Sequence, residues 1–144
     1  MPANIDPIYT KKGVQANNGT TGMNQAVLLA ANDFTGISAN NSLIFTADAT
    51  NGSYVERIIL KPIGTNVVSA MRFFINNGAA VGTATNNTYI GDATLPATTI
   101  SAVNGMVEVN FYLGFALMPG FKIYMGLATA VAAGWVALPV AGDY

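Results

Sequence analysis

Side chains capable of acid–base or nucleophilic chemistry are scarce in this chain. Its 144 residues include no histidine and no cysteine, and its acidic residues number 7. Without those two residue types, a Ser-His-Asp arrangement, a thiolate nucleophile and His- or Cys-ligated metal sites are excluded. The serines are therefore predicted to be turn or strand hydroxyls: Ser38, Ser42, Ser53, Ser69 and Ser101.

Two glutamates raise the question of glycosidase chemistry, which needs a pair of carboxyl groups facing one another. Glu56 and Glu108 both lie in segments with strand character, and a sheet could place them opposite each other. Nothing in the sequence shows that it does. We expect both to face solvent or to pair with Arg57, Arg72 or Lys122, as charged residues on a sheet usually do. A small carbohydrate-active enzyme is the third of three hypotheses.

The segment DATNGS, from Asp48 to Ser53, offers oxygen atoms of the kind that calcium prefers. It lacks the run of acids and the distal glutamate of an EF-hand loop. A plain turn is favoured over an ion site, and the sequence predicts no catalytic residue, no metal and no cofactor.

Composition describes an apolar chain with very little charge. Hydrophobic residues make up 51%, which excludes a disordered protein, and charged residues 9%, against roughly 25% in an ordinary soluble domain. The surface must be polar but uncharged, or covered by partners. A net charge of −1 and a single basic pair, Lys11-Lys12, predict no nucleic-acid partner. The length fits one domain.

Short apolar runs separated by Asn, Gly, Asp and Pro predict an all-β chain. No window of helical length keeps a 3.6-residue period free of breakers. We expect an antiparallel β-sandwich over 23–144, with strands near 25–31, 42–48, 54–61, 66–75, 87–91, 97–103, 106–116, 121–129 and 134–140.

Two of these strands are predicted to form a hairpin, because KPIGTN supplies Pro and Gly between 54–61 and 66–75. Alternation within 66–75 places Met71 and Phe73 on one face and Arg72 on the other. Alternation within 54–61 is less regular and groups Val55 with Arg57.

The run from Ile123 to Gly142 carries no charged side chain and is as long as the roughly 20 residues that a helix needs to cross a bilayer. Its first part, however, alternates large apolar residues with Lys, Tyr, Gly and Ala, and Gly134 and Pro139 interrupt its second part. Two buried strands with a turn between them are therefore predicted in place of a membrane span.

Residues 1–22 contain two prolines, a basic pair and a Gly/Asn/Thr tract, so they are not expected to fold alone. One interpretation is a frayed terminus. The other is an extended N-terminal arm that adds to a neighbouring subunit, with assembly contacts at Ile8, Tyr9, Lys11 and Lys12. No secretory signal is visible, so synthesis in a cytoplasm is expected.

Aromatic residues supply further candidates for assembly contacts. Phe73, Phe111, Phe115 and Phe121 lie in apolar strands and are predicted to be core. Tyr and Trp carry a polar atom that needs a partner and are enriched in interfaces. Tyr124, Trp135 and Tyr144 are the candidates of this kind, with Tyr54 considered beside them and core packing as the alternative for each.

Three motifs give the chain a resemblance to a known group of proteins. They are Arg72-Phe73 in the segment ERIILKPIGTNVVSAMRFFINNG, the turn Leu117 to Phe121, and the ending Gly142-Asp143-Tyr144. With these motifs the chain resembles short virion proteins of tailed bacteriophages, among them capsid decoration or cement proteins. The resemblance covers 54–144 and implies a jelly-roll-like sandwich that binds the outside of an assembled head.

That resemblance leads to the first hypothesis, a non-enzymatic virion protein, made in the host cytoplasm and located on the capsid exterior. Its implied partners are the major capsid protein and its own copies, often as a homotrimer, with no nucleic acid and no membrane. The second hypothesis is a host-recognition module on a tail or fibre, in which exposed Asn, Tyr and Trp side chains bind glycans.

Overall fold

The computed structural model of the chain describes residues 12–15 and 29–144. The predicted contact residues Ile8, Tyr9 and Lys11 lie outside these ranges, as does most of the segment predicted to be an arm. The predicted strand at 25–31 also lies largely outside them. In its described part, Ala30 makes a single bridge to Leu127.

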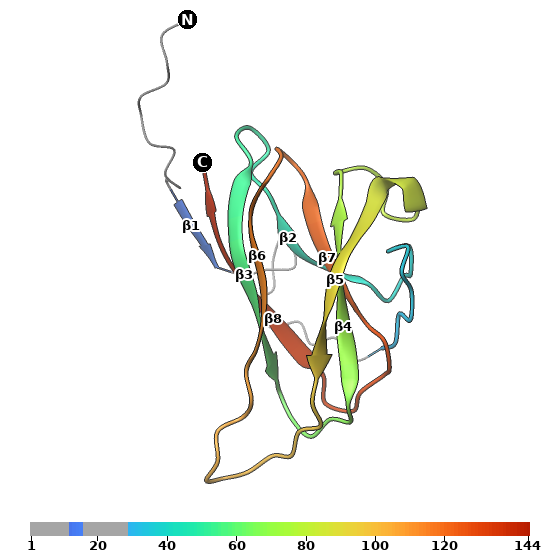
Figure 1. Cartoon of the computed structure of the whole chain (residues 1–144), viewed down its shortest axis with the longest axis vertical. Coiled ribbons are helices and arrows are strands. Elements are labelled where there is room, and N and C mark those ends of the chain that lie inside the picture. The colour runs from blue at the N-terminus through green and yellow to red at the C-terminus, as the bar shows by residue number, and fades with distance from the viewer. Residues whose placement is uncertain (1–11, 16–28) are drawn as a thin grey trace, which may run out of the picture.

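Eight strands and one short 3₁₀ helix make up the described fold (Figure 1). The strands are β1 (Lys12–Gln15), β2 (Ser42–Thr46), β3 (Ser53–Pro62), β4 (Ser69–Asn76), β5 (Asn87–Leu95), β6 (Val109–Leu117), β7 (Lys122–Leu127) and β8 (Trp135–Asp143), with the helix η1 at Ala84–Asn86. The prediction of an all-β chain is confirmed, with boundaries near those expected for most strands.

The strands form two antiparallel sheets that pack as a β-sandwich. The first sheet has the order β1-β8-β3-β6 and the second the order β2-β7-β4-β5. Among the described strands, only β4 and β5 are consecutive in the chain and also paired in a sheet. The other consecutive strands lie in different sheets, so most connections run from one sheet to the other. Strands adjacent in space are therefore mostly distant in sequence.

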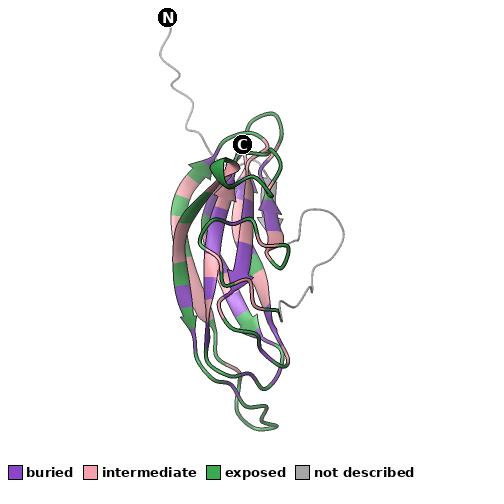
Figure 2. Cartoon of the chain, turned by 90° about the vertical axis from the view of Figure 1, so that its right-hand side faces the viewer, coloured by how far each residue is buried: buried purple, intermediate pink, exposed green. Residues whose placement is uncertain are grey.

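The core lies between the sheets and is almost wholly apolar. Figure 2 shows the buried residues along the strands and the exposed ones concentrated in the loops at both ends. The rings of Phe73 from β4 and Phe111 from β6 stack across the two sheets with centroids 4.3 Å apart. Gly91 of β5 gives this pair its space, since a Cβ there would come within 3.1 Å of the Phe111 ring.

The predicted hairpin between 54–61 and 66–75 is wrong. β3 pairs with β6 and β8, whereas β4 pairs with β5 and β7. The apolar faces of both strands, with Leu60 and Met71 fully buried, point into the core from opposite sides. Residues 63–68 therefore cross the roughly 10 Å between the sheets, and core burial overrides the local turn signal.

A bulge in β3 explains why the predicted grouping of Val55 with Arg57 fails. The register of β3 shifts between these two residues against both of its neighbours. An extra residue reverses which side chains face inward. Val55, Ile58 and Leu60 are buried as a result, while Glu56 is exposed. In β4, by contrast, the predicted inward residues Met71 and Phe73 are both fully buried.

The predicted strand at 97–103 is also wrong. This stretch belongs to a long loop, in which Thr98 makes an isolated bridge to Asn66. The Ser101 hydroxyl oxygen accepts hydrogen bonds from the amides of Val103 and Asn104 at 3.2 and 3.1 Å, which closes a turn. Such serine turns compete with strand pairing.

β1 pairs with β8 of the same chain, with Lys12 opposite Asp143 and Gln15 opposite Val140. The predicted contact residue Lys12 thus lies in the backbone register of its own sheet. Residues 12–15 are part of the sandwich and do not belong to a free arm. A deletion of 1–22 would remove β1 from the first sheet.

The uncharged run from Ile123 to Gly142 forms β7, a turn and β8, as predicted. The two strands belong to opposite sheets, with Ile123, Met125 and Trp135 buried between them. Within the described ranges, no helix is long and apolar enough to cross a membrane.

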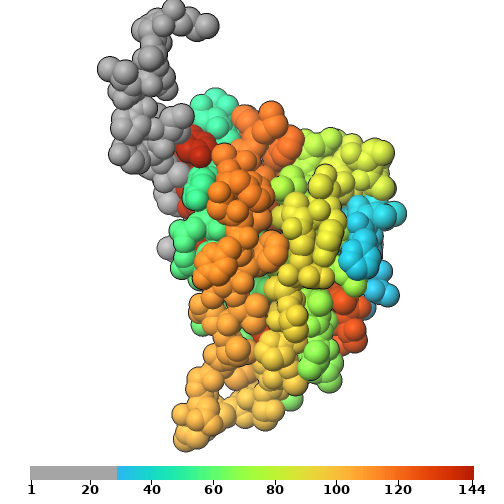
Figure 3. All heavy atoms as spheres, in the orientation of Figure 1, coloured from blue at the N-terminus to red at the C-terminus, as the bar shows by residue number. Residues whose placement is uncertain are grey.

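Residues 29–41, here called the covering loop, cross the outer face of the second sheet and return to β2 (blue in Figure 3). The amides of Ala31 and Asn32 bond to the Leu127 carbonyl on β7, and the Asn87 side chain bonds to the Thr35 carbonyl beside β5. Gly36 lies so close to the Phe74 ring that a Cβ would come within 3.1 Å of it. The loop thereby buries Phe74 on the outer side of the sheet.

One carboxylate organises the covering loop. Asp33 accepts hydrogen bonds from the Thr35, Gly36 and Ser38 amides, from the Thr35 hydroxyl and from the Asn41 side chain. Partial burial alone would raise the pKa of this carboxyl group. The hydrogen bonds to the carboxylate outweigh this effect of burial and lower the pKa to about 2. They come from the Thr35 hydroxyl, the Ser38 and Thr35 amides and the Asn41 side chain.

We expect the covering loop to loosen as the pH falls from about 4 to about 2. Because the folded pKa of Asp33 lies below its ordinary value of 3.8, its stabilisation is present above that value and is lost as the carboxyl group protonates in the folded state. Solvent screening at this partly exposed site limits the effect to about 1 kcal/mol or less. Amide exchange at Gly36 and Ser38, compared between the parent chain and Asp33→Asn, measures it. An identical acid response of these amides in both proteins would contradict the assignment.

Candidate functional site

Three loops meet at one end of the sandwich, at the bottom of Figure 1. They are residues 63–68 between β3 and β4, residues 96–108 between β5 and β6, and residues 128–134 between β7 and β8. We call this surface the loop end. The loop 96–108 projects furthest, and its yellow and orange atoms form the lower tip in Figure 3.

The buried side chain of Asn66 ties the three loops together. Its Oδ1 accepts hydrogen bonds from the amides of Ala133 and Gly134 at 2.9 and 2.8 Å. Its Nδ2 donates to the Gly134 and Gly64 carbonyl oxygens at 3.1 and 3.2 Å. Its backbone pairs with that of Thr98, and the Thr98 hydroxyl donates to the Gly64 carbonyl at 2.7 Å. A polar centre with every group bonded holds the loop end in a defined shape.

Large aliphatic side chains cover the loop end and face solvent. Val103, at the tip, is 88% exposed. The others are exposed to a smaller extent and come from two of the three loops and their flanks: Ile63, Val67, Val68, Ile100 and Val107. Single exposed apolar residues are ordinary, but several on loops that meet at one end of a sandwich suit an interaction site.

The loop end also lacks charge. Residues 62–71, 93–107 and 123–142, which include the three loops except for Glu108, contain no Asp, Glu, Lys or Arg. At its border Lys61 and Glu108 pair with each other at 2.7 Å, and the hydrogen bond from Lys61 lowers the pKa of Glu108. A partner therefore has no charge to neutralise on the loop end, and contact there is expected to depend little on salt.

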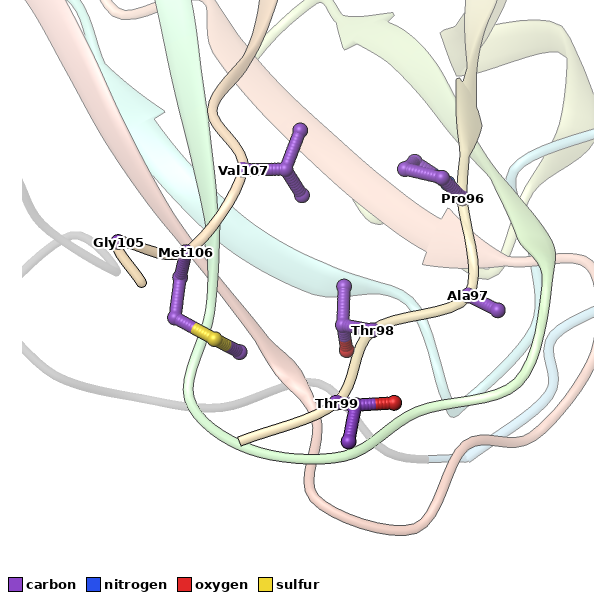
Figure 4. Close-up of a pocket in the computed structure, with 7 residues that line it drawn as sticks. All are labelled: Pro96, Ala97, Thr98, Thr99, Gly105, Met106 and Val107. Atoms are coloured by element: carbon purple, nitrogen blue, oxygen red, sulfur yellow. The ribbon is translucent and has the colours of Figure 1, made fainter. Parts of the chain in front are cut away.

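A shallow pocket of about 300 Å³ opens between the two arms of the loop 96–108 (Figure 4). Pro96 and Val107 point toward each other across it, and Thr98, Thr99 and Met106 line its lower part. The lining side chains are apolar apart from two hydroxyls, and polar atoms form a large part of the pocket surface. Its size and chemistry suit one aliphatic or aromatic side chain of a partner, the kind of pocket in which interface hot spots sit.

Trp135, predicted as an assembly contact, is 0% exposed and lies in the core. β8 directs it inward together with Ala137 and Ala141, which pack against the same core. The interpretation of Trp135 as a contact residue is therefore wrong, and the alternative of core packing holds. Its indole Nε1 is buried without a hydrogen-bond partner in the described structure.

The structure does not bring the other candidates together. Tyr124 lies on β7 opposite Phe74, half-buried on the outer face of the second sheet, and burial raises its pKa. Tyr144 follows β8 at the opposite end from the three loops, where its amide bonds to the Gly52 carbonyl at 3.3 Å. Neither residue contributes to the loop end.

Glu56 and Glu108 do not form a carboxylate pair. Glu56 pairs with its neighbour Arg57, and Glu108 pairs with Lys61. Because Lys61 is five residues from Glu56 along β3, the two glutamates are roughly 16 Å apart at about 3.3 Å per residue. Glycosidase carboxyls lie within roughly 10 Å of each other. Both glutamates are exposed, as one of the two expectations had it. Glu56 pairs with the predicted partner Arg57, whereas Glu108 pairs with Lys61, which was not among the predicted partners.

The segment 48–53 forms a turn. The Asp48 carboxylate accepts hydrogen bonds from the Thr50 and Asn51 amides at 2.9 and 2.7 Å. The Ser53 hydroxyl donates to Asp143 at 2.5 Å. Within 12–15 and 29–144, no group of three or more acidic residues could hold a metal ion.

Sequence reasoning missed the loop end because it assigned 97–103 to a strand. The signal that could have found it is the coincidence of Ile100 and Val103 with turn residues such as Ser101, Asn104 and Gly105, in a stretch without charge. Apolar residues between turn residues are exposed more often than those in a strand.

Comparison with known protein families, with curated proteins and with solved structures found no match to this chain. The loop end, with its exposed aliphatic side chains and lack of charge, is therefore the feature on which a functional proposal rests. Its chemistry suits binding to another protein surface.

Proposed function

We propose that this chain is a non-enzymatic structural subunit that docks through its loop end on a larger protein assembly. The observation that carries the proposal is the group of exposed aliphatic side chains on an uncharged surface held rigid by Asn66. Burial of apolar area provides the free energy of docking. A preformed surface avoids the entropic cost of ordering loops on contact.

The assembly in this proposal is the head of a tailed bacteriophage, and the partner is the major capsid protein on its outer surface. The support is the resemblance of the motifs at Arg72-Phe73, Leu117 to Phe121 and Gly142-Asp143-Tyr144 to those of decoration proteins. Copies repeated by capsid symmetry, as trimers or otherwise, would bridge neighbouring subunits. Many modest contacts then stabilise the shell together.

A jelly-roll fold is part of the same proposal. Its support is the strand order β1-β8-β3-β6 against β2-β7-β4-β5, in which the first and last strands are neighbours and the chain alternates between sheets. Eight strands arranged as two Greek keys characterise jelly rolls, which are frequent in viral capsid and lectin domains. The proposed arm precedes β1, with contacts at Ile8, Tyr9 and Lys11.

A charge placed at the loop end is expected to abolish docking. In the double variant Ile100→Lys and Val103→Lys, two ammonium groups would be buried against the capsid without partners, so we expect affinity for isolated phage heads to fall at least a hundredfold. Thr85→Lys, an exposed lysine in η1 at the opposite end, is the matched control and should bind as the parent chain does. Cosedimentation with heads measures both. Equal binding by the double variant would show that another surface docks.

Immunogold electron microscopy of parent virions tests the assembly itself. Gold spread evenly over the heads supports a decoration protein. Gold confined to tails would contradict a decoration protein and favour the host-recognition hypothesis. Virions without gold would overturn the assignment to a phage particle.

A further inference from the structure

The outer face of the second sheet carries an aromatic cluster that includes none of the loop-end residues. The rings of Phe34, from the covering loop, and Tyr89, from β5, meet edge to face with centroids 5.4 Å apart. The Arg72 guanidinium of β4 lies 3.9 Å from the Phe34 ring centroid. Phe34 is 58% exposed and Tyr89 38% exposed, so both rings present apolar surface to solvent.

The covering loop buries Phe74, but this role does not require Phe34 to be exposed. Phe74 is covered by Gly36 and lies against the Tyr89 ring at a centroid distance of 5.9 Å. Phe34 extends beyond this contact. The Asp33 hydrogen bonds fix the loop on either side of it, and Arg72 donates to the Asn32 side chain at 3.2 Å. An exposed phenyl ring is thus held in one orientation, as preorganised binding sites require.

Polar groups of both kinds surround the rings. Asp92 lies directly opposite Arg72 in the β4–β5 register. Burial, together with the hydrogen bond and negative charge of Asp92, raises the pKa of Tyr89, so its hydroxyl stays protonated near neutral pH. Arg72 Nε is buried without a hydrogen-bond partner within the described residues, so any donor that Arg72 offers to a ligand is a terminal nitrogen of its guanidinium. The cluster combines aromatic faces with a carboxylate, a guanidinium and an amide. Arg72 and Asp92 balance each other in charge, and the ionised Asp33 carboxylate precedes Phe34.

We propose that Phe34, Tyr89, Arg72 and Asp92 form a binding site for a neutral saccharide. A pyranose has an apolar C–H face, which stacks on an aromatic ring, and hydroxyl groups at its edge, which both donate and accept hydrogen bonds. Phe34 and Tyr89 provide the stacking surface. Asp92 accepts from hydroxyl groups, and Arg72 donates to them. The opposite charges of Arg72 and Asp92, with the Asp33 carboxylate beside Phe34, favour an uncharged sugar over an acidic one.

The site goes beyond docking, because it lies on a sheet face and not at the loop end. A subunit docked through its loops would keep this face free to bind a surface glycan. The aromatic residues of the site, Phe34 and Tyr89, are not among the aromatic candidates that the sequence suggested.

A glycan array probed with the full chain, followed by titration of the bound saccharide by NMR, tests the proposal. We expect neutral oligosaccharides to bind, and Phe34→Ala to weaken binding at least tenfold while Phe34→Tyr, which keeps the ring, retains it. Tyr112→Ala removes an aromatic side chain, 71% exposed, from the other sheet and should change nothing. Thermal melting checks that each variant folds.

Three results would overturn the proposal. An array without neutral saccharide binding would do so, and so would binding that survives Phe34→Ala. If a protein bound the cluster and the array stayed empty, the face would be a protein contact. None of these results would alter the head-binding experiment on the loop end, so the two proposals fail separately.

Discussion

An Asn66→Ala variant is expected to lose about 3 kcal/mol of unfolding free energy, because removing one partner leaves buried groups unsatisfied. The amides of Ala133 and Gly134 would lose their common acceptor, Asn66 Oδ1; Asn66 is buried, the Gly134 bond is buried and the Ala133 bond is partly buried. Each buried donor without a partner costs about 1–3 kcal/mol. The two carbonyls that Asn66 Nδ2 bonds keep other donors, Ile63 N for Gly134 and the Thr98 hydroxyl for Gly64, so they add little.

Urea unfolding measures this loss, and Asn104→Ala is the control. Asn104 lies exposed in the loop 96–108, so its replacement should change stability by less than about 0.5 kcal/mol. Asn66→Ala should also weaken docking on phage heads, since the loops lose their common anchor. A variant that loses under about 1 kcal/mol would mean that backbone pairing with Thr98 alone holds the loop end together.

A Phe73→Ala variant is expected to lose about 3–5 kcal/mol, the usual cost of removing a buried aromatic ring. Phe73 is fully buried and stacks on Phe111 at 4.3 Å with an interplanar angle of 16°. The two rings come from opposite sheets, so the substitution opens a cavity at the sheet interface. Neighbouring side chains on rigid strands can close it only in part.

The double variant Phe73→Ala and Phe111→Ala isolates the stacking contact. The combined loss should fall short of the sum of the single losses by at least about 0.5 kcal/mol, since each single variant already breaks the contact. Tyr112→Ala, next to Phe111 but facing outward, is the control and should have little effect. Strictly additive losses would show that the rings are buried independently and do not stabilise each other.

Strand positions could be predicted from sequence where alternation and burial agree. In β4, Met71 and Phe73 face inward as their spacing predicts, and the uncharged run after Lys122 forms the two predicted strands. Local alternation reports which residues face one way in a regular strand. It fails in β3, where one extra residue between Val55 and Arg57 reverses the faces.

Strand pairing could not be predicted, because it depends on contacts far apart in sequence. The turn signal in KPIGTN describes local backbone geometry equally well in a hairpin and in a crossing between sheets. Both surfaces proposed for binding depend on such contacts. Asn66 joins loops through Gly134, and Phe34 meets Tyr89 across the second sheet, so neither cluster is apparent in the linear chain.

The same topology governs how the chain reaches its fold. Apart from β4 and β5, the described strands pair with partners distant in sequence, and β1 pairs with the last strand, β8. Each pairing requires closing a long loop before its contacts contribute, which places such sandwiches among the slow folders, on a millisecond to second timescale. During that interval the aliphatic loops are exposed beside unpaired strand edges. Aggregation of newly synthesised copies is then a hazard, and the small net charge of the chain gives little electrostatic repulsion between copies to oppose it.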